Sequence, residues 1–204
     1  MSAPAFVSDV GKVLIDFDFS IAARRLAEKC PHPAETVLTC LDDIKLPYED
    51  GRIDDAEFVR EAVRLSGFTG SPAEFEAIWC GIFTQNEPMH ATLGGLKGKA
   101  SMFLLSNTSG LHKDYFLRSF DIFGHFSDGV YSYSARCSKP GEAIFHHTIE
   151  KFDLDPTRTF YVDDLLPNIE TAARLGFRTF HYSFAKHREF EAALAEWQVE
   201  QGIG

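Results

Sequence analysis

Hydrophobic and polar positions along this chain follow two patterns, one typical of buried strands and one typical of helices. Short apolar runs typical of buried strands lie at residues 5–9, 98–107, 128–134, 157–164 and 177–183. Residues 11–17 read as a turn and a short extended piece. Stretches with helical spacing lie at residues 111–120, 141–152, 168–176 and 188–201. This alternation predicts an α/β fold with a Rossmann-like parallel sheet sandwiched by helices.

Between residues 19 and 88 the pattern is helical only. Asp54 with Glu57, and Ser71 with Glu74, have the spacing of a capping box at a helix start. Earlier helices are expected at 20–29 and 34–44. The segment therefore predicts an inserted, all-helical cap.

The change of pattern divides the chain into two predicted domains. The catalytic core would comprise residues 1–18 and 89–204, and the helical cap residues 19–88. Linkers are expected near residues 17–20 and 86–92. The second contains Asn86 and Pro88, and Gly94 and Gly95 follow shortly after it.

Composition narrows the possible partners. The net charge is −10 and no basic run occurs, so nucleic acid is not expected as a partner. No apolar run approaches the length of a membrane span, so no membrane partner is expected either. The four cysteines form no CxxC pair and read as free thiols of a reducing compartment. With no basic, apolar leader at the N-terminus, a cytoplasmic protein is expected.

Polar side chains end three of the apolar runs. AFVSD closes on Asp9, SMFLLSN on Ser106 and Asn107, and TFYVDD on Asp163 and Asp164. Because ligands of an open parallel sheet bind outside the carboxyl ends of its strands, these groups should meet at one edge. Each could also be an ordinary turn or helix-cap residue.

The chemistry of the set points to phosphoryl transfer. Two adjacent carboxylates at a buried strand end repel each other, so a positive group should lie beside Asp163 and Asp164. Oxygen ligands alone favour Mg²⁺. The hydroxyl of Ser106 and backbone N–H groups at Ser106 and Asn107 can hold phosphate oxygens. Lys139, just before a predicted helix, would add a positive charge, although most lysines are simply solvated.

These stretches resemble the haloacid dehalogenase-like (HAD) hydrolase superfamily over essentially the whole chain. The resemblance is carried by VSDVGKVLIDFD, LLSNT, SKPGEAIFHHTIEKF and FYVDDLLPNIETAARLGF. YEDGRIDDAEF also resembles members with a helical cap. Within that group the chain looks most similar to the sugar-phosphate phosphatase branch that includes the bacterial glucose-1-phosphate phosphatase.

The resemblance implies a Mg²⁺-dependent hydrolase of small phosphorylated metabolites. Asp9 would attack phosphorus and form an aspartyl-phosphate that water then hydrolyses. Mg²⁺ would be held by Asp9, the carbonyl of Gly11 and Asp164, with Asp163 a ligand or the partner of one. Ser106 would hydrogen-bond a phosphoryl oxygen.

In the same scheme Lys139 would bridge Asp9 and the phosphate. It would keep the carboxylate ionised and offset the charge that develops in the transition state.

One position departs from the family pattern. The usual motif has a second Asp two residues after the nucleophile as general acid and base, and here that residue is Gly11. Loss of such an acid typically costs about 10²–10⁴-fold in rate. Asp16, Asp18 or a cap residue would have to supply the proton, unless the leaving group needs little help.

Two other functions stay open at this point. A 2-haloacid dehalogenase needs no proton for its halide, but the family's dehalogenases work without metal and lack a pair like Asp163 and Asp164. A catalytically weak binding or scaffold protein would not need the set Asp9, Ser106, Lys139 and Asp164. The phosphatase is the favoured hypothesis.

Overall fold

A five-stranded parallel sheet forms the centre of the molecule in the computed structural model, which describes residues 3–204. The strand order is β5-β4-β1-β6-β7. The strands are β1 (Ala5–Ser8), β4 (Ser101–Ser106), β5 (Asp128–Tyr131), β6 (Thr159–Asp163) and β7 (Arg178–His181). The predicted α/β fold is confirmed, with β1 in the middle of the sheet.

Neighbouring residues of the central strands face opposite sides of the sheet. Phe6 packs in one hydrophobic cluster with residues of α6 (Glu87–Gly94), α7 (Gly110–Ser119) and α11 (His187–Gln201). Val7 packs in another with residues of α9 (Glu142–Phe152) and α10 (Leu166–Arg174). Helices therefore cover both faces, as expected for strands that are apolar along their whole length.

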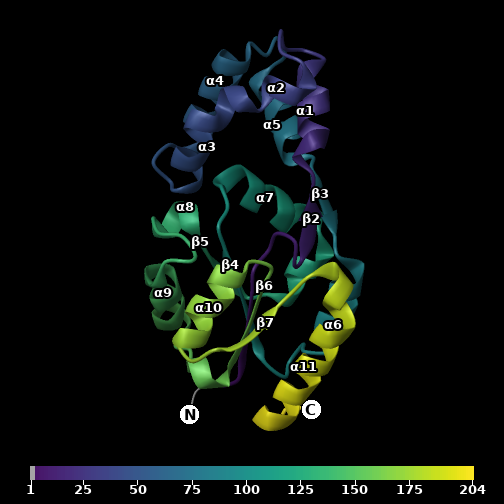
Figure 1. The fold of residues 1–204 in the computed structure, drawn as a ribbon, viewed down its shortest axis with the longest axis vertical. Helices are drawn as coiled ribbons and strands as arrows, with labels where there is room; N and C mark the ends of the chain where they lie inside the picture. The colour runs from purple at the N-terminus through teal and green to yellow at the C-terminus, as the bar shows by residue number, and fades with distance from the viewer. Residues whose placement is uncertain (1–2) are drawn as a thin grey trace.

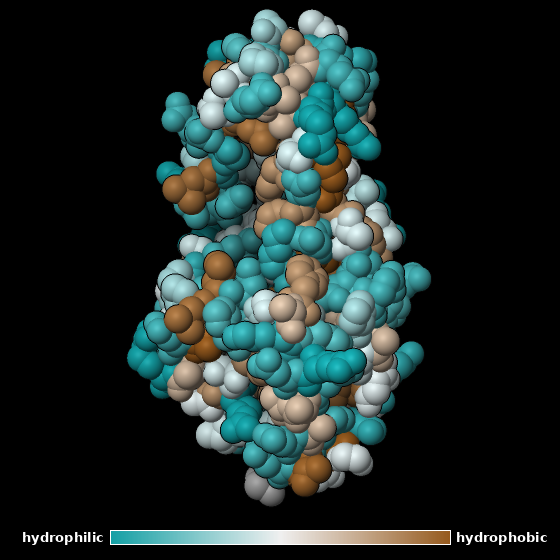
Figure 2. Space-filling model, turned by 45° about the vertical axis from the view of Figure 1, so that its right-hand side comes forward, coloured by the Kyte–Doolittle hydropathy of each residue, from teal (hydrophilic) through white to brown (hydrophobic). Residues whose placement is uncertain are grey.

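Five helices lie apart from the sheet at one end of the molecule, opposite the two chain termini (Figure 1). They are α1 (Phe19–Ala27), α2 (Ala34–Val37), α3 (Asp42–Glu49), α4 (Asp55–Ser66) and α5 (Pro72–Cys80). Their buried side chains form a cluster of their own, rich in aromatic contacts: Tyr48 stacks on Phe58, and Trp79 packs against Phe58 at a tilt. This narrower upper part shows hydrophilic residues with apolar ones between them on the face seen in Figure 2.

The two predicted capping boxes start helices as expected. The Asp54 side chain accepts a hydrogen bond from the Glu57 N–H at 2.8 Å, and Ser71 accepts one from the Glu74 N–H at 3.2 Å. The caps fix the first turns of α4 and α5 because they satisfy N–H groups that have no partner inside the helix.

Three expectations about local structure are wrong. Residues 19–88 are not all helical, because β3 (Phe83–Gln85) pairs antiparallel with β2 (Ile15–Phe17). The expected linker at 86–92 is mostly helix α6, whose first turn is capped by the Asn86 side chain. The run at 128–134 leaves the sheet at Tyr131 and turns into α8 (Ser132–Ala135).

No helix within residues 3–204 combines the length and the hydropathy that a membrane crossing requires.

Candidate active site

The sheet brings the predicted strand-end residues together. Asp9 directly follows β1, Ser106 ends β4 and Asp163 ends β6, and these three strands are neighbours. Carboxylate oxygens of Asp9, Asp163 and Asp164 all lie within 4.8 Å of one another. Parallel strands explain this convergence, since their carboxyl ends share one edge.

Lys139 lies in the middle of this group. Its Nζ is 2.9 Å from Asp9 Oδ1 and 2.7 Å from Asp163 Oδ2, and it donates to the Leu105 carbonyl at 2.8 Å. An ammonium group has three hydrogens, so each has an acceptor. The Lys139 side chain is only 1% exposed, and its charge is therefore compensated by both acids without help from water.

The pKa values reflect this mixture of burial and charge. Burial raises the pKa of Asp9 to about 7, against the pull of Lys139, and Asp163 adds to the rise. Burial would also raise the pKa of Asp163, but Lys139 and hydrogen bonds lower it below the ordinary 3.8. Burial opposes the charge of Lys139, yet the two carboxylates raise its pKa. The Lys139–Asp163 pair is thus the ionised anchor of the site.

The two acids of the doublet have different environments. Asp163 is fully buried and accepts hydrogen bonds from Leu165 N–H at 2.8 Å, from the Asn168 amide at 2.9 and 3.0 Å, and from the Tyr161 hydroxyl. Asp164 is only half-buried, and partial burial followed by Asp163 raises its pKa. Asp163 is therefore committed to its protein partners, and Asp164 is the acid with free oxygens.

The donor set fits a magnesium ion. When all three carboxylates are ionised, one ammonium leaves two negative charges without a partner, and oxygen ligands suit a hard divalent cation. Asp9, Asp164 and the Gly11 carbonyl would be the ligands. Asp163 would support the metal site indirectly, because it holds Lys139 and the start of α10 in place.

Asn107 has a clear structural task. Its amide accepts a hydrogen bond from the Lys139 N–H and donates one to the Lys139 carbonyl, both at 2.9 Å. This pair of bonds fixes the loop that carries Lys139. The Asn107 side chain is thus already engaged, and only its backbone N–H is left for the phosphate contact that the sequence predicts.

A pocket of about 230 Å³ opens beside these groups. Its lining includes Asp9, Gly11, Ser106, Lys139 and Asp164. The Ser106 hydroxyl is buried and has only a long contact, 3.5 Å, to the Asn107 carbonyl. The predicted nucleophile, phosphate-binding hydroxyl and lysine therefore face one cavity with the Gly11 backbone.

A second pocket of about 100 Å³ shares Gly11, Phe17, Ser106 and Asn107 with the first. Half of its remaining lining is aromatic, and the lining comes from both parts of the molecule: Phe19, Phe83, His112 and Phe116, with Val10, Ile15, Glu49 and Thr108. The charged and the aromatic pockets are contiguous. Together they have room for an anionic group with a small organic substituent.

The two predicted proton donors do not line either pocket. Asp16 is paired with Lys12 and accepts the Phe17 N–H at 2.8 Å. Asp18 is the exposed N-cap of α1, where hydrogen bonds from Ser20 lower its pKa. Both carboxylates are engaged in local structure, Asp16 with Lys12 and Asp18 at the start of α1.

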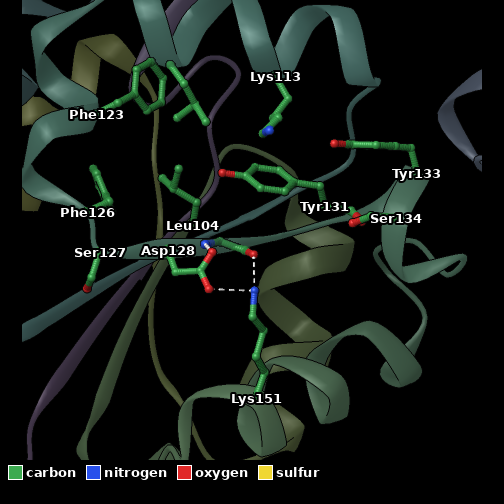
Figure 3. A pocket seen from close by; sticks show the side chains of 12 residues that line it. Leu104, Lys113, Phe123, Phe126, Ser127, Asp128, Tyr131, Tyr133, Ser134 and Lys151 are labelled. Carbon is green, nitrogen blue, oxygen red and sulfur yellow. Dashed lines mark hydrogen bonds and ion pairs between the residues drawn. The ribbon is translucent and has the colours of Figure 1, made fainter. Parts of the chain in front are cut away.

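A separate pocket of about 410 Å³ lies beside edge strand β5 (Figure 3). Its two lysines already have acidic partners: Lys151 contacts Asp128 at 2.8 Å, and Lys113 contacts Asp114 at 2.8 Å. No acidic cluster like the one around Lys139 is found among its lining residues. The chemistry of the molecule is concentrated at the strand ends.

His112 makes the aromatic pocket sensitive to acid. Its ring stacks on Trp79 with centroids 5.6 Å apart, and burial lowers its pKa to about 4. The unfolded chain takes up this proton below about pH 6.5, whereas the folded protein takes it up only near pH 4. We expect the free energy of unfolding to fall by roughly 2–3 kcal/mol as pH drops through this window.

Urea unfolding between pH 7 and 4 measures this dependence. His112→Phe, which keeps an aromatic ring beside Trp79, should flatten the profile. An unchanged profile in this variant would show that other groups cause the loss.

Several residues of the site have no strong signal in the sequence. Tyr161 and Asn168 both bind Asp163, and Ser132 links the two parts of the molecule. Asn168 could have been found as a buried amide in the first turn of a helix right after an acidic pair. Tyr161 reads as one more apolar residue of a buried strand.

Comparison with known proteins supports this arrangement. The family model for haloacid dehalogenase-like hydrolases matches residues 5–176. D-ribitol-5-phosphate phosphatase of Bacteroides thetaiotaomicron is 27% identical over 183 residues, covering 85% of this chain and 89% of the relative.

Solved structures with a similar fold include two hydrolases of this kind. A HAD family enzyme from Bacteroides thetaiotaomicron, in complex with magnesium and inorganic phosphate, has a TM-score of 0.76 at 26% identity, covering 88% of this chain and 93% of its own. An L-2-haloacid dehalogenase from Xanthobacter autotrophicus, with a TM-score of 0.62, 16% identity and coverage of 100% of this chain and 85% of its own, shares the fold. By the family match over most of its length, this chain belongs to the haloacid dehalogenase-like hydrolases.

Proposed function

We propose that the protein is a Mg²⁺-dependent phosphatase of small phosphate monoesters, with sugar or polyol phosphates as the substrate class. The observation that carries the proposal is the buried cluster of Asp9, Asp163 and Asp164 around Lys139, open to a pocket lined by Ser106. The phosphatase relative and the neighbour with bound magnesium and phosphate support it.

Asp9 is the nucleophile in this proposal. One of its oxygens contacts Lys139, which leaves the other to attack phosphorus and form an aspartyl-phosphate. When bound by Asp9, Asp164 and the Gly11 carbonyl, Mg²⁺ would supply the positive charge that lets an anionic ester approach an anionic side chain. Ser106 and the Asn107 N–H would hold the phosphoryl oxygens, and Lys139 would stabilise the developing charge through Asp9.

The cap chooses the substrate. We propose residues 19–88 as the cap domain and residues 1–18 with 89–204 as the catalytic core. The aromatic pocket at their junction would hold the alcohol part of the ester, and its volume of about 100 Å³ favours a leaving group of a few carbon atoms. Carbon-bound hydrogens of a polyol or sugar can pack on such rings while its hydroxyls stay polar.

We propose a cytoplasmic location for this activity. The four cysteines are all free thiols, as the sequence predicts for a reducing compartment. Phosphorylated metabolites are the expected partners.

A panel of phosphate esters assayed with Mg²⁺ and with a chelator tests the proposal. It should include polyol 5-phosphates, sugar 1-phosphates and sugar 6-phosphates, with 2-chloropropionate beside them. Phosphate release that requires Mg²⁺ would support the proposal. Chloride release without metal would instead identify a dehalogenase, and the absence of any turnover would favour a binding protein.

Asp16→Asn and Asp18→Asn should each retain activity within about threefold, whereas loss of a general acid typically costs about 10²–10⁴-fold. Asn is as good an N-cap as Asp, so Asp18→Asn should also keep α1 intact. Steady-state kinetics on the best ester of the panel measures both. A hundredfold loss in either variant would return that residue to the catalytic set.

A further inference from the structure

The site has Gly11 where the family pattern has an acid. The structure shows why a side chain does not fit at this position. A Cβ placed on Gly11 would lie 2.9 Å from a carbon of the Phe17 ring. The Phe17 ring thus occupies the space that an aspartate at position 11 would need. The proton for the leaving group has to come from another direction.

Glu49 is the remaining carboxyl group that lines this part of the described structure. Among the described residues that line the two contiguous pockets, the acids are Asp9, Asp164 and Glu49. The first two lie on the phosphate side. Glu49, the last residue of α3, lines the aromatic pocket together with Gly11 and Ser106. It therefore approaches from the cap, on the side where the alcohol part of an ester would lie.

The backbone of Glu49 is fixed across the junction of cap and core. The Ser132 hydroxyl donates to the Glu49 carbonyl at 2.9 Å and accepts from the Thr108 N–H at 3.1 Å. Thr108 follows Ser106 and Asn107 in the same loop. A chain of hydrogen bonds thus connects Glu49 to the loop that would hold the phosphate.

The neighbouring residue strengthens this connection. The Tyr48 hydroxyl accepts from the Leu111 N–H of α7 at 3.1 Å and donates to Asp55 of the cap. Tyr48 is buried. The end of α3 is therefore held on the core at two successive residues, which is the rigid support that a proton donor requires.

The surroundings of Glu49 favour its acid form. Glu49 is exposed as a whole residue, but partial desolvation of its carboxyl raises the pKa; Lys45 opposes the rise and Asp50 adds to it. A carboxyl with a raised pKa is protonated more often near neutral pH than an ordinary one, which is the state that a general acid needs.

We propose that Glu49 is the general acid of the reaction and protonates the leaving-group oxygen from the cap. The inference rests on the phosphatase function proposed above. As the bond between Asp9 Oδ and phosphorus forms, the bond from phosphorus to the ester oxygen breaks, and the proton of Glu49 moves to that oxygen. Glu49 is left as a carboxylate. It regains a proton from the water that hydrolyses the aspartyl-phosphate, which closes the cycle.

The dependence on the leaving group tests this role. Glu49→Gln keeps the size and polarity of the side chain but carries no acidic proton. With an alkyl ester such as a polyol phosphate, kcat/KM should fall by about 10²–10³-fold. With p-nitrophenyl phosphate, whose leaving group departs without protonation, it should change by less than about threefold.

A control on the same helix separates this effect from a disturbance of the cap. Asp43 is exposed, lies in α3 and lines neither pocket. Asp43→Asn should leave both rates unchanged, and thermal melting should show that both variants are folded.

The outcomes distinguish the two proposals. Equal losses on both esters in Glu49→Gln, or no loss on either, would overturn the role of Glu49 while the wild-type enzyme still hydrolyses esters with Mg²⁺. If the wild-type protein itself shows no Mg²⁺-dependent turnover of any ester, the proposed function fails instead.

Discussion

Asp9→Asn is expected to lower kcat by about 10⁴-fold or more, the scale seen when a nucleophile is removed. Asp9 follows the central strand β1, and its carboxylate contacts Lys139 and lies within 4.8 Å of the carboxylates of Asp163 and Asp164. An amide at this position keeps the shape but lacks the carboxylate oxygen that attacks phosphorus, so no aspartyl-phosphate forms. The measurement is steady-state phosphate release in the presence of Mg²⁺.

The fold of this variant should survive. Asp163 still balances Lys139 at 2.7 Å, so no charge is left without a partner. Melting curves should show a well-folded protein. Asp43→Asn, at an exposed position, is a matched control that should keep full activity. A folded Asp9→Asn protein with more than a tenth of wild-type kcat would refute Asp9 as the nucleophile.

Among substitutions in the site, Lys139→Met should cause the largest loss of protein stability. It leaves Asp9 and Asp163 buried 2.9 and 2.7 Å from where the ammonium was, with no cation between them. Breaking a buried ion pair by removing one partner costs about 3–5 kcal/mol. We expect the free energy of unfolding in urea at pH 7 to fall by that amount, and turnover to be lost.

Lys151→Met is the control for this experiment. Lys151 also pairs with an acid, Asp128 (Figure 3), at 2.8 Å. Both side chains are more than a third exposed. Exposed pairs contribute about 0–1 kcal/mol. If the two lysine variants lose the same small amount, the ammonium of Lys139 is not the electrostatic anchor described above.

The strand ends are the part of the site that the sequence predicts best. Asp9, Ser106 and Asp163 stand where continuous apolar runs stop, and a parallel sheet has to bring such positions to one edge. The sequence signal for Lys139 is weaker, since it is only a lysine in a loop just before a predicted helix, and its bridging role comes from the family resemblance. Its contact to Asp163 depends on the loop that Asn107 holds, and no local pattern encodes a hydrogen bond across 32 residues.

Where the prediction fails, long-range pairing decides the structure. β3 has only three residues and exists because it pairs with β2, about 70 residues earlier in the chain. The Pro and Gly residues near 86–92 resemble a linker, but buried Met89 and Leu93 make α6 part of the core. Packing of an apolar face outweighs weak local propensity in both cases.

The identity of the general acid is also decided by long-range packing that the sequence does not reveal. From the sequence, Asp16 and Asp18 are candidates because they are close to Asp9, yet their oxygens contact Lys12 and cap the start of α1. Glu49 is 40 residues away and reaches the pocket only through the docking of α3 on the core. Residues contributed by a cap cannot be located without the junction between cap and core.

Mass spectrometry of the acid-quenched enzyme during turnover tests the central claim most directly. With a polyol phosphate and Mg²⁺, the peptide that contains Asp9 should carry a phosphoryl group, and it should carry none when Mg²⁺ is chelated. Steady phosphate release with no phosphoryl group on Asp9, or with one on a different residue, would contradict the account.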